Sequence, residues 1–338
     1  MKKTIFLGTL TAIGLVAGSA MAGTLEDVKA KGFLQCGVTT GLVGFAAPDA
    51  NGNWGGFDVD FCRAVAAAVL GDPQAVKFTP TTGKTRFTAL ASGEIDLLAR
   101  NTTWTFSRDV DLKFTFIGVN YYDGQGFMVP KELGVTSAKE LDGATVCIQT
   151  GTTTELNLAD FFRANNISYE PVPIETNAEG QAQYLAGACD TYTTDASGLA
   201  ATRATFENPG DHIILPEIIS KEPLGPLVRH GDDQWADIAR WTLNALISAE
   251  ELGITSANLA EMAKGTDKPE INRLLGTEGD LGGMFGLSKD WAVKAIAAGG
   301  NYGEIFARNI GESTAIGLAR GLNAQWTNGG LIYSPPFR

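Results

Sequence analysis

The sequence predicts an α/β protein built from two lobes, and three observations lead to this prediction. From residue 33 to about residue 250, short apolar runs typical of buried strands alternate with segments whose apolar residues recur at helical spacing. The alternation falls into two blocks that meet near Gln125. Each block also ends a strand in polar side chains, where open α/β sheets bind small ligands. We therefore expect a ligand cleft between two lobes.

The first 22 residues have the pattern of a secretory signal peptide. Lys2 and Lys3 precede a mainly apolar run over 5–16, and Ala20-Met21-Ala22 has the small residues of a cleavage site. Position 23 is glycine and not cysteine, so no lipid anchor is indicated. No later stretch is apolar for long enough to cross a bilayer. We expect an exported protein.

The net charge of −12 argues against two classes of partner. Nucleic acids and anionic lipid surfaces are bound by clusters of positive charge, whereas this chain is acidic overall. An anion can bind only where a few arginines create a local positive site.

Four cysteines follow the predicted cleavage site, and an even number in an exported chain indicates disulfides. Cys36 lies on the first strand and Cys62 on the first helix, while Cys147 and Cys189 lie on strand-like runs of the second block. Among three possible pairings we favour one bridge per lobe, Cys36–Cys62 and Cys147–Cys189. A zinc site is the alternative, but the chain has no Cys-x-x-Cys pair and only two histidines. We expect no metal.

The first block contains three predicted strands and two predicted helices. The strands cover 33–38, 76–79 and 95–99. The first helix follows a turn at Gly55 and Gly56, with Asp58 as its N-cap, and a short helix covers 86–91.

The second block repeats this alternation. Its strands are predicted at 126–129, 144–149 and 190–194. Ser137 and Glu140 form a capping box before a short helix, and Thr152 and Glu155 form another before a helix that runs to about Asn165.

One half of a candidate site follows the strand at 95–99. Arg100, Asn101, Thr103 and Arg108 come directly after it. The planar guanidinium of Arg108 can bind a carboxylate through two hydrogen bonds, and the neutral side chains add donors and acceptors. The alternative is a surface ion pair between Arg108 and a nearby acid such as Asp109.

The other half lies in the second block. Thr153 stands beside the free backbone amides of a helix start, which favour an anion. Asp195 ends a strand and is a suitable partner for an ammonium group, although a helix N-cap is the alternative. One half-site per lobe indicates a cleft that closes on a small zwitterion.

Five motifs, in order, resemble those of the periplasmic amino-acid-binding proteins of ATP-driven importers, the family 3 solute-binding proteins. They lie at 56–60 (GFDVD), 87–96, 103–108, 149–153 and 225–231. The resemblance covers roughly residues 30–250, and runs at 100–105 and 325–331 resemble the subgroup that binds L-amino acids broadly. It implies a type II periplasmic binding fold, with two lobes joined by a two-stranded hinge. The implied divisions are 1–22 signal peptide, 23–123 first lobe, 124–222 second lobe, and 223–338 return to the first lobe plus an extension.

The resemblance also implies ligand contacts. The arginine that binds the α-carboxylate falls on Arg108, with Thr103 and Thr153 as further donors. The acid that binds the α-ammonium falls on Asp195, with Asn101 as an additional contact.

Other positions of the implied pocket bear on specificity. Thr39 and Leu42 replace an aspartate and a tyrosine that are common in the family, and Gly83 replaces an aromatic platform. Arg86 lies where relatives that bind glutamate or aspartate place an arginine for the side-chain carboxylate. Arg100 and Gln149 complete the predicted site. These residues indicate a wide pocket that favours polar and acidic amino acids.

The implied function is that of the periplasmic substrate-binding component of an ABC importer. It would act as a monomer without a cofactor, capture L-amino acids by cleft closure and deliver them to the membrane permease subunits. The alternative is a periplasmic enzyme on the same scaffold, such as a dehydratase. That enzyme would need a general acid or base in the cleft, and the only candidate, Asp195, would be occupied by the ammonium group. We expect no catalytic residue.

The segment from about residue 253 onwards extends beyond the usual family length. Its glycine-rich run at 279–286 lacks the preceding strand of a phosphate-binding loop, so we expect an ordinary loop. Helical patterns at 291–298 and 302–309 predict packing on the first lobe.

Overall fold

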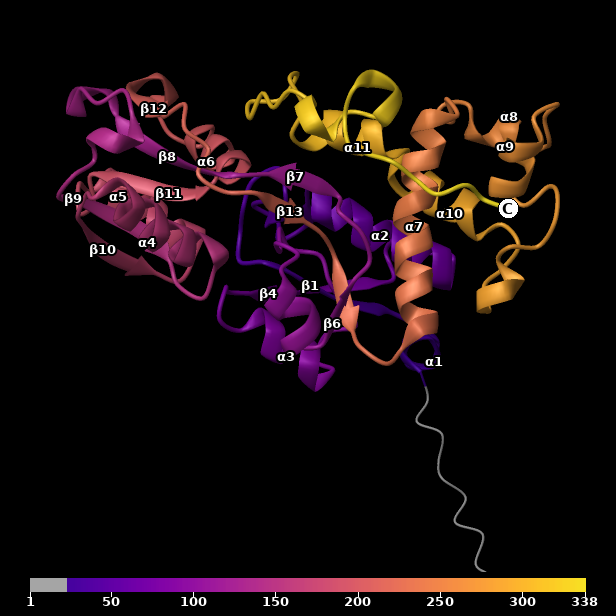
Figure 1. Cartoon of the computed structure of the whole chain (residues 1–338). Helices are drawn as coiled ribbons and strands as arrows, with labels where there is room; N and C mark the ends of the chain where they lie inside the picture. The colour runs from indigo at the N-terminus through magenta and orange to yellow at the C-terminus, as the bar shows by residue number, and fades with distance from the viewer. Residues whose placement is uncertain (1–22) are drawn as a thin grey trace, which may run out of the picture.

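The computed structural model describes residues 23–338, so the predicted signal peptide at 1–22 lies outside the described residues. Figure 1 shows two α/β lobes side by side, with lobe 2 at the left and lobe 1 at the centre and right. The antiparallel strands β7 (Tyr121–Asp123) and β13 (Glu222–Leu224) run between the lobes and form a two-stranded hinge. The predicted two-lobed α/β architecture is confirmed.

Lobe 1 is built on a five-stranded sheet with the order β4-β1-β5-β14-β6. Its strands are β1 (Leu34–Thr39), β4 (Val76–Thr81), β5 (Leu97–Leu98), β6 (Phe114–Phe116) and β14 (Leu227–Arg229). Strands β4 and β5 run parallel to β1, whereas β14 returns from lobe 2 and pairs antiparallel with β5 and β6. Strand β5 is shorter than the predicted 95–99, although the N–H groups of Asp96 and Ala99 still donate to β1 carbonyls.

Helices cover this sheet, and a small two-stranded ribbon precedes the first long one. They are α1 (Thr24–Lys31), α2 (Phe57–Leu70), α3 (Arg86–Ser92) and α7 (Asp233–Glu251), with the ribbon formed by β2 (Ala47–Pro48) and β3 (Trp54–Gly55). Apolar residues of α2 and α7 are buried in one core cluster.

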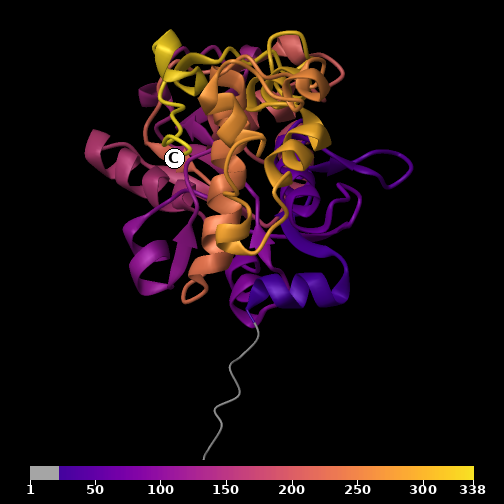
Figure 2. The same cartoon turned by 90° about the vertical axis from the view of Figure 1, so that its right-hand side faces the viewer.

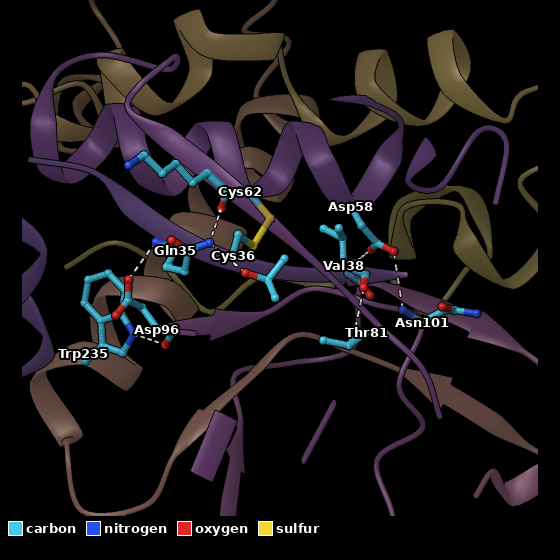
Figure 3. The surroundings of a disulfide bond; sticks show 12 residues. Gln35, Cys36, Val38, Asp58, Cys62, Thr81, Asp96, Asn101 and Trp235 are labelled. Carbon is cyan, nitrogen blue, oxygen red and sulfur yellow. Dashed lines mark hydrogen bonds between the residues drawn. A yellow bond between two sulfur atoms is a disulfide. The ribbon is translucent and has the colours of Figure 1, made fainter. Parts of the chain in front are cut away.

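The N-cap predicted at Asp58 is wrong, because α2 begins after Gly56. Gly56 has a φ of 131°, and a Cβ there would lie 2.3 Å from the carbonyl oxygen of Phe45, so only glycine fits this turn. Asp58 is instead buried in the first turn of the helix, where its carboxylate accepts from the Asn101 N–H at 3.4 Å. Figure 3 shows Asp58 directed toward Asn101.

Lobe 2 has a second five-stranded sheet with the order β10-β9-β11-β8-β12. The strands are β8 (Gln125–Pro130), β9 (Ala144–Gln149), β10 (Tyr169–Ile174), β11 (Thr191–Asp195) and β12 (His212–Ile214). Its helices are α4 (Thr153–Asn165), α5 (Asn177–Leu185) and α6 (Ala196–Arg203). Strand β9 has the predicted bounds, and β9, β10 and β11 run parallel.

The two predicted capping boxes have different outcomes. The box of Ser137 and Glu140 forms at a 3-10 turn, η3 (Ala138–Glu140). Thr152 caps α4 by accepting from the N–H of Glu155 at 3.2 Å, but the Glu155 carboxylate accepts from Gly151 and not from Thr152. Only half of the second box is therefore present. Short 3-10 turns also lie at η2 (Lys131–Leu133) and η4 (Pro209–Asp211).

Each lobe contains one disulfide, as predicted. Cys36–Cys62 links β1 to α2, as Figure 3 shows, and Cys147–Cys189 links β9 to the turn before β11. The Cα atoms are 6.3 Å and 5.6 Å apart, within the usual range for disulfides. Because all four cysteines are bonded, the zinc alternative is wrong.

The C-terminal segment packs on lobe 1, as predicted, and Figure 2 shows it gathered around α7. It contains α8 (Leu259–Met262), α9 (Pro269–Leu274), α10 (Trp291–Gly299), α11 (Tyr302–Asn309) and the 3-10 turns η5 (Gly283–Phe285), η6 (Gly321–Asn323) and η7 (Trp326–Asn328). Trp291 and Ile296 of α10 are buried against α2 and α7. The glycine-rich run at 279–286 is a loop that holds η5, in line with the prediction.

The same segment reaches the hinge. The side-chain oxygen of Asn323 accepts from the N–H of Tyr122 in β7 at 2.6 Å, and its amide donates to the Tyr122 carbonyl at 3.1 Å. The Tyr302 hydroxyl donates to the carbonyl of Asn120, just before β7, at 2.8 Å. The C-terminal segment therefore holds one hinge strand from outside. Over residues 23–338, no helix combines the length and apolar character that a membrane span requires.

Candidate functional site

The two lobes meet beside the hinge around a small polar cavity with a free volume of about 20 Å³. Its lining residues are Arg86, Arg100, Asn101, Thr103, Gln149, Thr152, Thr153, Thr154, Thr194 and Asp195. All ten are polar, and seven of them belong to the ten predicted ligand residues. The structure therefore brings the two predicted half-sites together. Thr152, Thr154 and Thr194 were not predicted as ligand residues.

Arg108 lies just behind this lining on η1 (Ser107–Asp111), a π-helical turn after β5. Its Nη1 donates to the carbonyl of Thr103 at 2.9 Å, and its guanidinium stands over the ring of Phe87. Asp109 does not pair with it; this carboxylate accepts from the Trp104 indole N–H at 2.7 Å and lies 3.5 Å from His230. The surface ion pair considered for Arg108 and Asp109 is thus wrong, and the guanidinium is buried.

Two further arginines from lobe 1 are buried at the cavity. Arg100 donates from Nε to the Thr81 carbonyl at 3.1 Å, and Arg86 donates from Nη1 to the Thr102 hydroxyl at 3.2 Å. Burial lowers the pKa of Arg100 and of Arg108 to about 10 each. Burial, together with these two neighbouring cations, lowers the pKa of Arg86 well below its ordinary value. Such a cluster favours an anion in the cavity.

Arg86 also has a donor to spare. Its Nε is buried and has no hydrogen-bond partner in the described part of the chain. A buried donor without an acceptor is costly, so a ligand that supplies an oxygen there gains a hydrogen bond.

Lobe 2 contributes an acid at the carboxyl end of β11. Asp195 occupies the N-cap position of α6, as the alternative expected, but its side chain makes no capping hydrogen bond to the helix. Asn101 Nδ2 donates to the Asp195 carboxylate across the cleft at 3.5 Å, and Asn101 Oδ1 is buried without a hydrogen-bond partner among residues 23–338. Burial and the nearby Asp123 and Glu222 raise the pKa of Asp195 well above its ordinary value. A bound cation would stabilise its ionised form.

The hydroxyls of Thr103 and Thr153 meet at the hinge side of the cavity. Their oxygens are 3.2 Å apart, and both donate to the carboxylate of Glu222 on β13, at 3.0 Å for Thr153. Glu222 was not among the residues predicted from the sequence, where it lies three residues before the motif at 225–231. Its partner Thr103 is 119 residues away, so only the fold brings them together.

The remaining predicted residues lie farther from the cavity or at its edge. Gln149 lines it and donates to the Glu175 carbonyl at 2.7 Å. Thr39 lies outside the lining and accepts from Asn177 of lobe 2 at 3.4 Å, while Leu42 is buried in the lobe 1 core. Thr39 and Leu42 therefore do not line the cavity.

Gly83 is a point of contact between the lobes. A Cβ there would lie 2.7 Å from the Thr150 carbonyl oxygen, so the backbone of lobe 2 fills the space that an aromatic ring would take. Gly83 therefore lets the two lobes approach each other and does not widen the cavity, contrary to expectation.

Residues 34–257 match the sequence profile of the bacterial extracellular solute-binding proteins, family 3. The chain belongs to this family. The resemblance noted in the sequence is therefore confirmed. The match ends close to where the C-terminal segment begins.

Two similar proteins align with the whole chain. The glutamate/glutamine/aspartate/asparagine-binding protein BztA of Rhodobacter capsulatus is 68% identical over 338 residues, covering 100% of both chains. The general L-amino acid-binding periplasmic protein AapJ of Rhizobium johnstonii is 61% identical over 342 residues, again covering 100% of both.

A solved structure is similar over nearly the same length. It is an ABC transporter periplasmic binding protein from Brucella ovis with glutathione bound, which is 60% identical and has a TM-score of 0.91. The match covers 94% of this chain and 100% of the Brucella chain. The C-terminal segment is thus shared by relatives of this length.

Proposed function

We propose that this solute-binding protein is the periplasmic component of an ABC importer that captures L-amino acids between its lobes. It delivers them to the membrane permease subunits and acts as a monomer without a cofactor. One observation carries the proposal: buried cations of lobe 1 and the buried acid Asp195 of lobe 2 face one small polar cavity. The names of BztA and AapJ support the amino-acid class.

Opposite charges on the two lobes suit the two ends of an amino acid. In this proposal the Arg108 guanidinium binds the α-carboxylate beside Thr103 and Thr153, and Asp195 binds the α-ammonium beside Asn101. The Nε–H of Arg86 then donates to an oxygen of an acidic or amide side chain. Gln149 and Arg100 also line the cavity.

The proposal treats the protein as a carrier and not an enzyme. Asp195 is the candidate acid or base on lobe 2, and a bound ammonium group would hold it ionised and occupied. We expect glutamate and glutamine to be recovered unchanged after prolonged incubation with the purified protein, as measured by mass spectrometry. Conversion of either ligand would favour the dehydratase-like alternative.

The Arg108→Ala variant tests whether Arg108 binds the α-carboxylate. Removing one partner of a buried ion pair costs about 2–5 kcal/mol, so affinity for L-glutamate and L-glutamine should fall by a factor of about 30 to several thousand. Isothermal titration calorimetry measures this loss, and circular dichroism checks the fold. Arg240→Ala is the matched control, because Arg240 pairs with Asp237 on the outer side of α7. Wild-type affinity in Arg108→Ala would end the carboxylate assignment.

Glutathione is a second candidate ligand, and the Brucella structure favours it. Its γ-glutamyl end carries the same α-carboxylate and α-ammonium groups as glutamate. We expect reduced glutathione to bind in calorimetry and to compete with glutamate. The dipeptide cysteinylglycine, which lacks the γ-glutamyl group, is the control and should not compete.

A further inference from the structure

Glu222 stands out because one buried carboxylate contacts both lobes and the hinge. It lies on β13 and is 1% exposed. One oxygen accepts from Thr103 of lobe 1 and from Thr153 of lobe 2 at 3.0 Å. The other accepts from Asn157 of lobe 2 at 2.7 Å and from Ser220, two residues earlier in the chain, also at 2.7 Å.

The other buried acid of the hinge makes a useful comparison. Asp123, which pairs with Glu222 in the β7–β13 ladder, accepts from the hydroxyl and N–H of Ser197 and from the N–H of Gly124. Ser197 belongs to lobe 2, so Asp123 bridges no gap between the lobes. Glu222 is the acid of this pair whose contacts depend on lobe position.

The physical consequence concerns closure. An ionised carboxylate only accepts hydrogen bonds, and a buried one is costly unless donors surround it. If the lobes separate, Thr103 and Thr153 move apart and Glu222 loses a donor from one of them. The closed arrangement satisfies all its bonds at once, so the carboxylate favours closure.

Glu222 also fixes the two hydroxyls at the cavity. Each hydroxyl has one hydrogen, and Glu222 receives both of them. The threonine oxygens are therefore held in place behind the proposed ligand seat, and in this arrangement neither hydroxyl donates to an α-carboxylate, unlike the donor role that the resemblance implies.

We propose that Glu222 is a positioning residue that holds Thr103 and Thr153 and couples ligand binding to closure of the lobes. This inference rests on the proposed capture of amino acids in the cleft. Glu222 acts through the threonines and does not itself need to touch the ligand.

The test is Glu222→Gln, which keeps the side-chain shape but replaces one acceptor oxygen with a donor. Stopped-flow fluorescence with L-glutamine gives the two rate constants. We expect the dissociation rate to rise about tenfold or more, from the loss of charge-assisted hydrogen bonds, with little change in association. Glu217→Gln is the matched control, because Glu217 accepts from Ala138 within lobe 2 alone and should leave both rates unchanged.

Small-angle X-ray scattering gives a second readout that needs no ligand. Ligand-free Glu222→Gln should have a larger radius of gyration than the wild type, because it closes less readily. Should this variant fail to fold, Asn157→Ala removes one lobe 2 donor from a partly exposed helix position outside the cavity lining. It should raise the dissociation rate about threefold to tenfold.

The outcomes separate this inference from the proposed function. Unchanged dissociation in Glu222→Gln, or in Asn157→Ala if only that variant folds, overturns the role of Glu222 while amino-acid binding stands. If the wild type binds no amino acid or glutathione, the proposed function fails, and scattering alone decides whether Glu222 favours closure. An equal radius of gyration in wild type and Glu222→Gln would then reject it.

Discussion

Burial beside the cleft changes the acidity of Asp58. Burial raises the pKa of this carboxyl from 3.8 to about 6, and its hydrogen bonds from Asn101 and Asn120 oppose the shift only in part. Because the folded state binds this proton more tightly than the unfolded chain, the stabilising contribution is complete below about pH 4. It is lost as the pH rises through about 6.

This shift predicts the behaviour of Asp58→Asn. The amide cannot ionise, so the variant escapes the cost of burying a charge at neutral pH. Relative to the wild type, its free energy of unfolding should improve by up to about 3 kcal/mol between pH 4 and pH 7. Urea unfolding at several pH values measures the difference. Asp49→Asn is the control, because Asp49 is on the surface and its pKa is lowered. If the difference in free energy of unfolding between Asp58→Asn and the wild type does not change with pH, the pKa of Asp58 is not raised.

Single residues were predictable where a local pattern marks them. Arg108 and Asp195 follow or end strands, and the carboxyl ends of strands in the two blocks face a common cleft. Glu222 has no such local sign, since Thr103, Thr153 and Asn157 are between 65 and 119 residues away. Gly83 was misjudged because its role depends on a contact with Thr150 of the other lobe.

At the scale of elements, strands with continuous apolar runs were predicted best. Strand β9 has the bounds that its sequence indicates, because six residues between two turns leave no other choice. The start of α2 was placed too late, since the sequence favours aspartate as an N-cap while the close approach of Phe45 selects Gly56. At this position the tertiary contact with Phe45, and not the local preference for an aspartate N-cap, determines where the helix begins.

The hinge strand β7 depends on a contact that lies far along the chain. Asn323 satisfies both the N–H and the carbonyl of Tyr122, and it is buried. Asn323→Ala leaves two backbone groups without these partners, which should lower the free energy of unfolding by about 1–3 kcal/mol. Denaturant unfolding measures the loss. Asn328→Ala, at an exposed position of the same segment, should be neutral; equal stability of the two variants would show that Asn323 does not support the hinge.

At the scale of the whole molecule, the lobes meet through both apolar and polar contacts. Ala200 and Ala201 of lobe 2 belong to the same buried core cluster as residues of lobe 1. Lys84 of lobe 1 pairs with Glu175 of lobe 2 at 2.9 Å, but both side chains are about half exposed and such pairs contribute little. Asn177 donates to the Gly41 carbonyl at 3.2 Å. A ligand would add to these contacts at the buried centre, where Asp195 and the arginines lie.

This arrangement predicts broad but biased selection among amino acids. The α-carboxylate and α-ammonium are common to every L-amino acid, so most of the binding energy in the proposed site comes from shared groups. All ten lining residues are polar, so shape selection for apolar side chains is weak, and the free Nε of Arg86 favours an oxygen. A side-chain contact of this kind discriminates by about 1–3 kcal/mol, or roughly 10–200-fold.

We therefore expect several L-amino acids to bind within about two orders of magnitude of one another, with glutamate, glutamine, aspartate and asparagine strongest. Competition calorimetry against a panel tests this order. Glutarate, which lacks the amine, and γ-aminobutyrate, which lacks the α-carboxylate, are the controls and should bind far more weakly, because each leaves Asp195 or Arg108 buried without its partner. One amino acid that binds more than a thousandfold tighter than all others would contradict broad selection. Strong binding of either control would contradict the assignment of Arg108 to the α-carboxylate and Asp195 to the α-ammonium group.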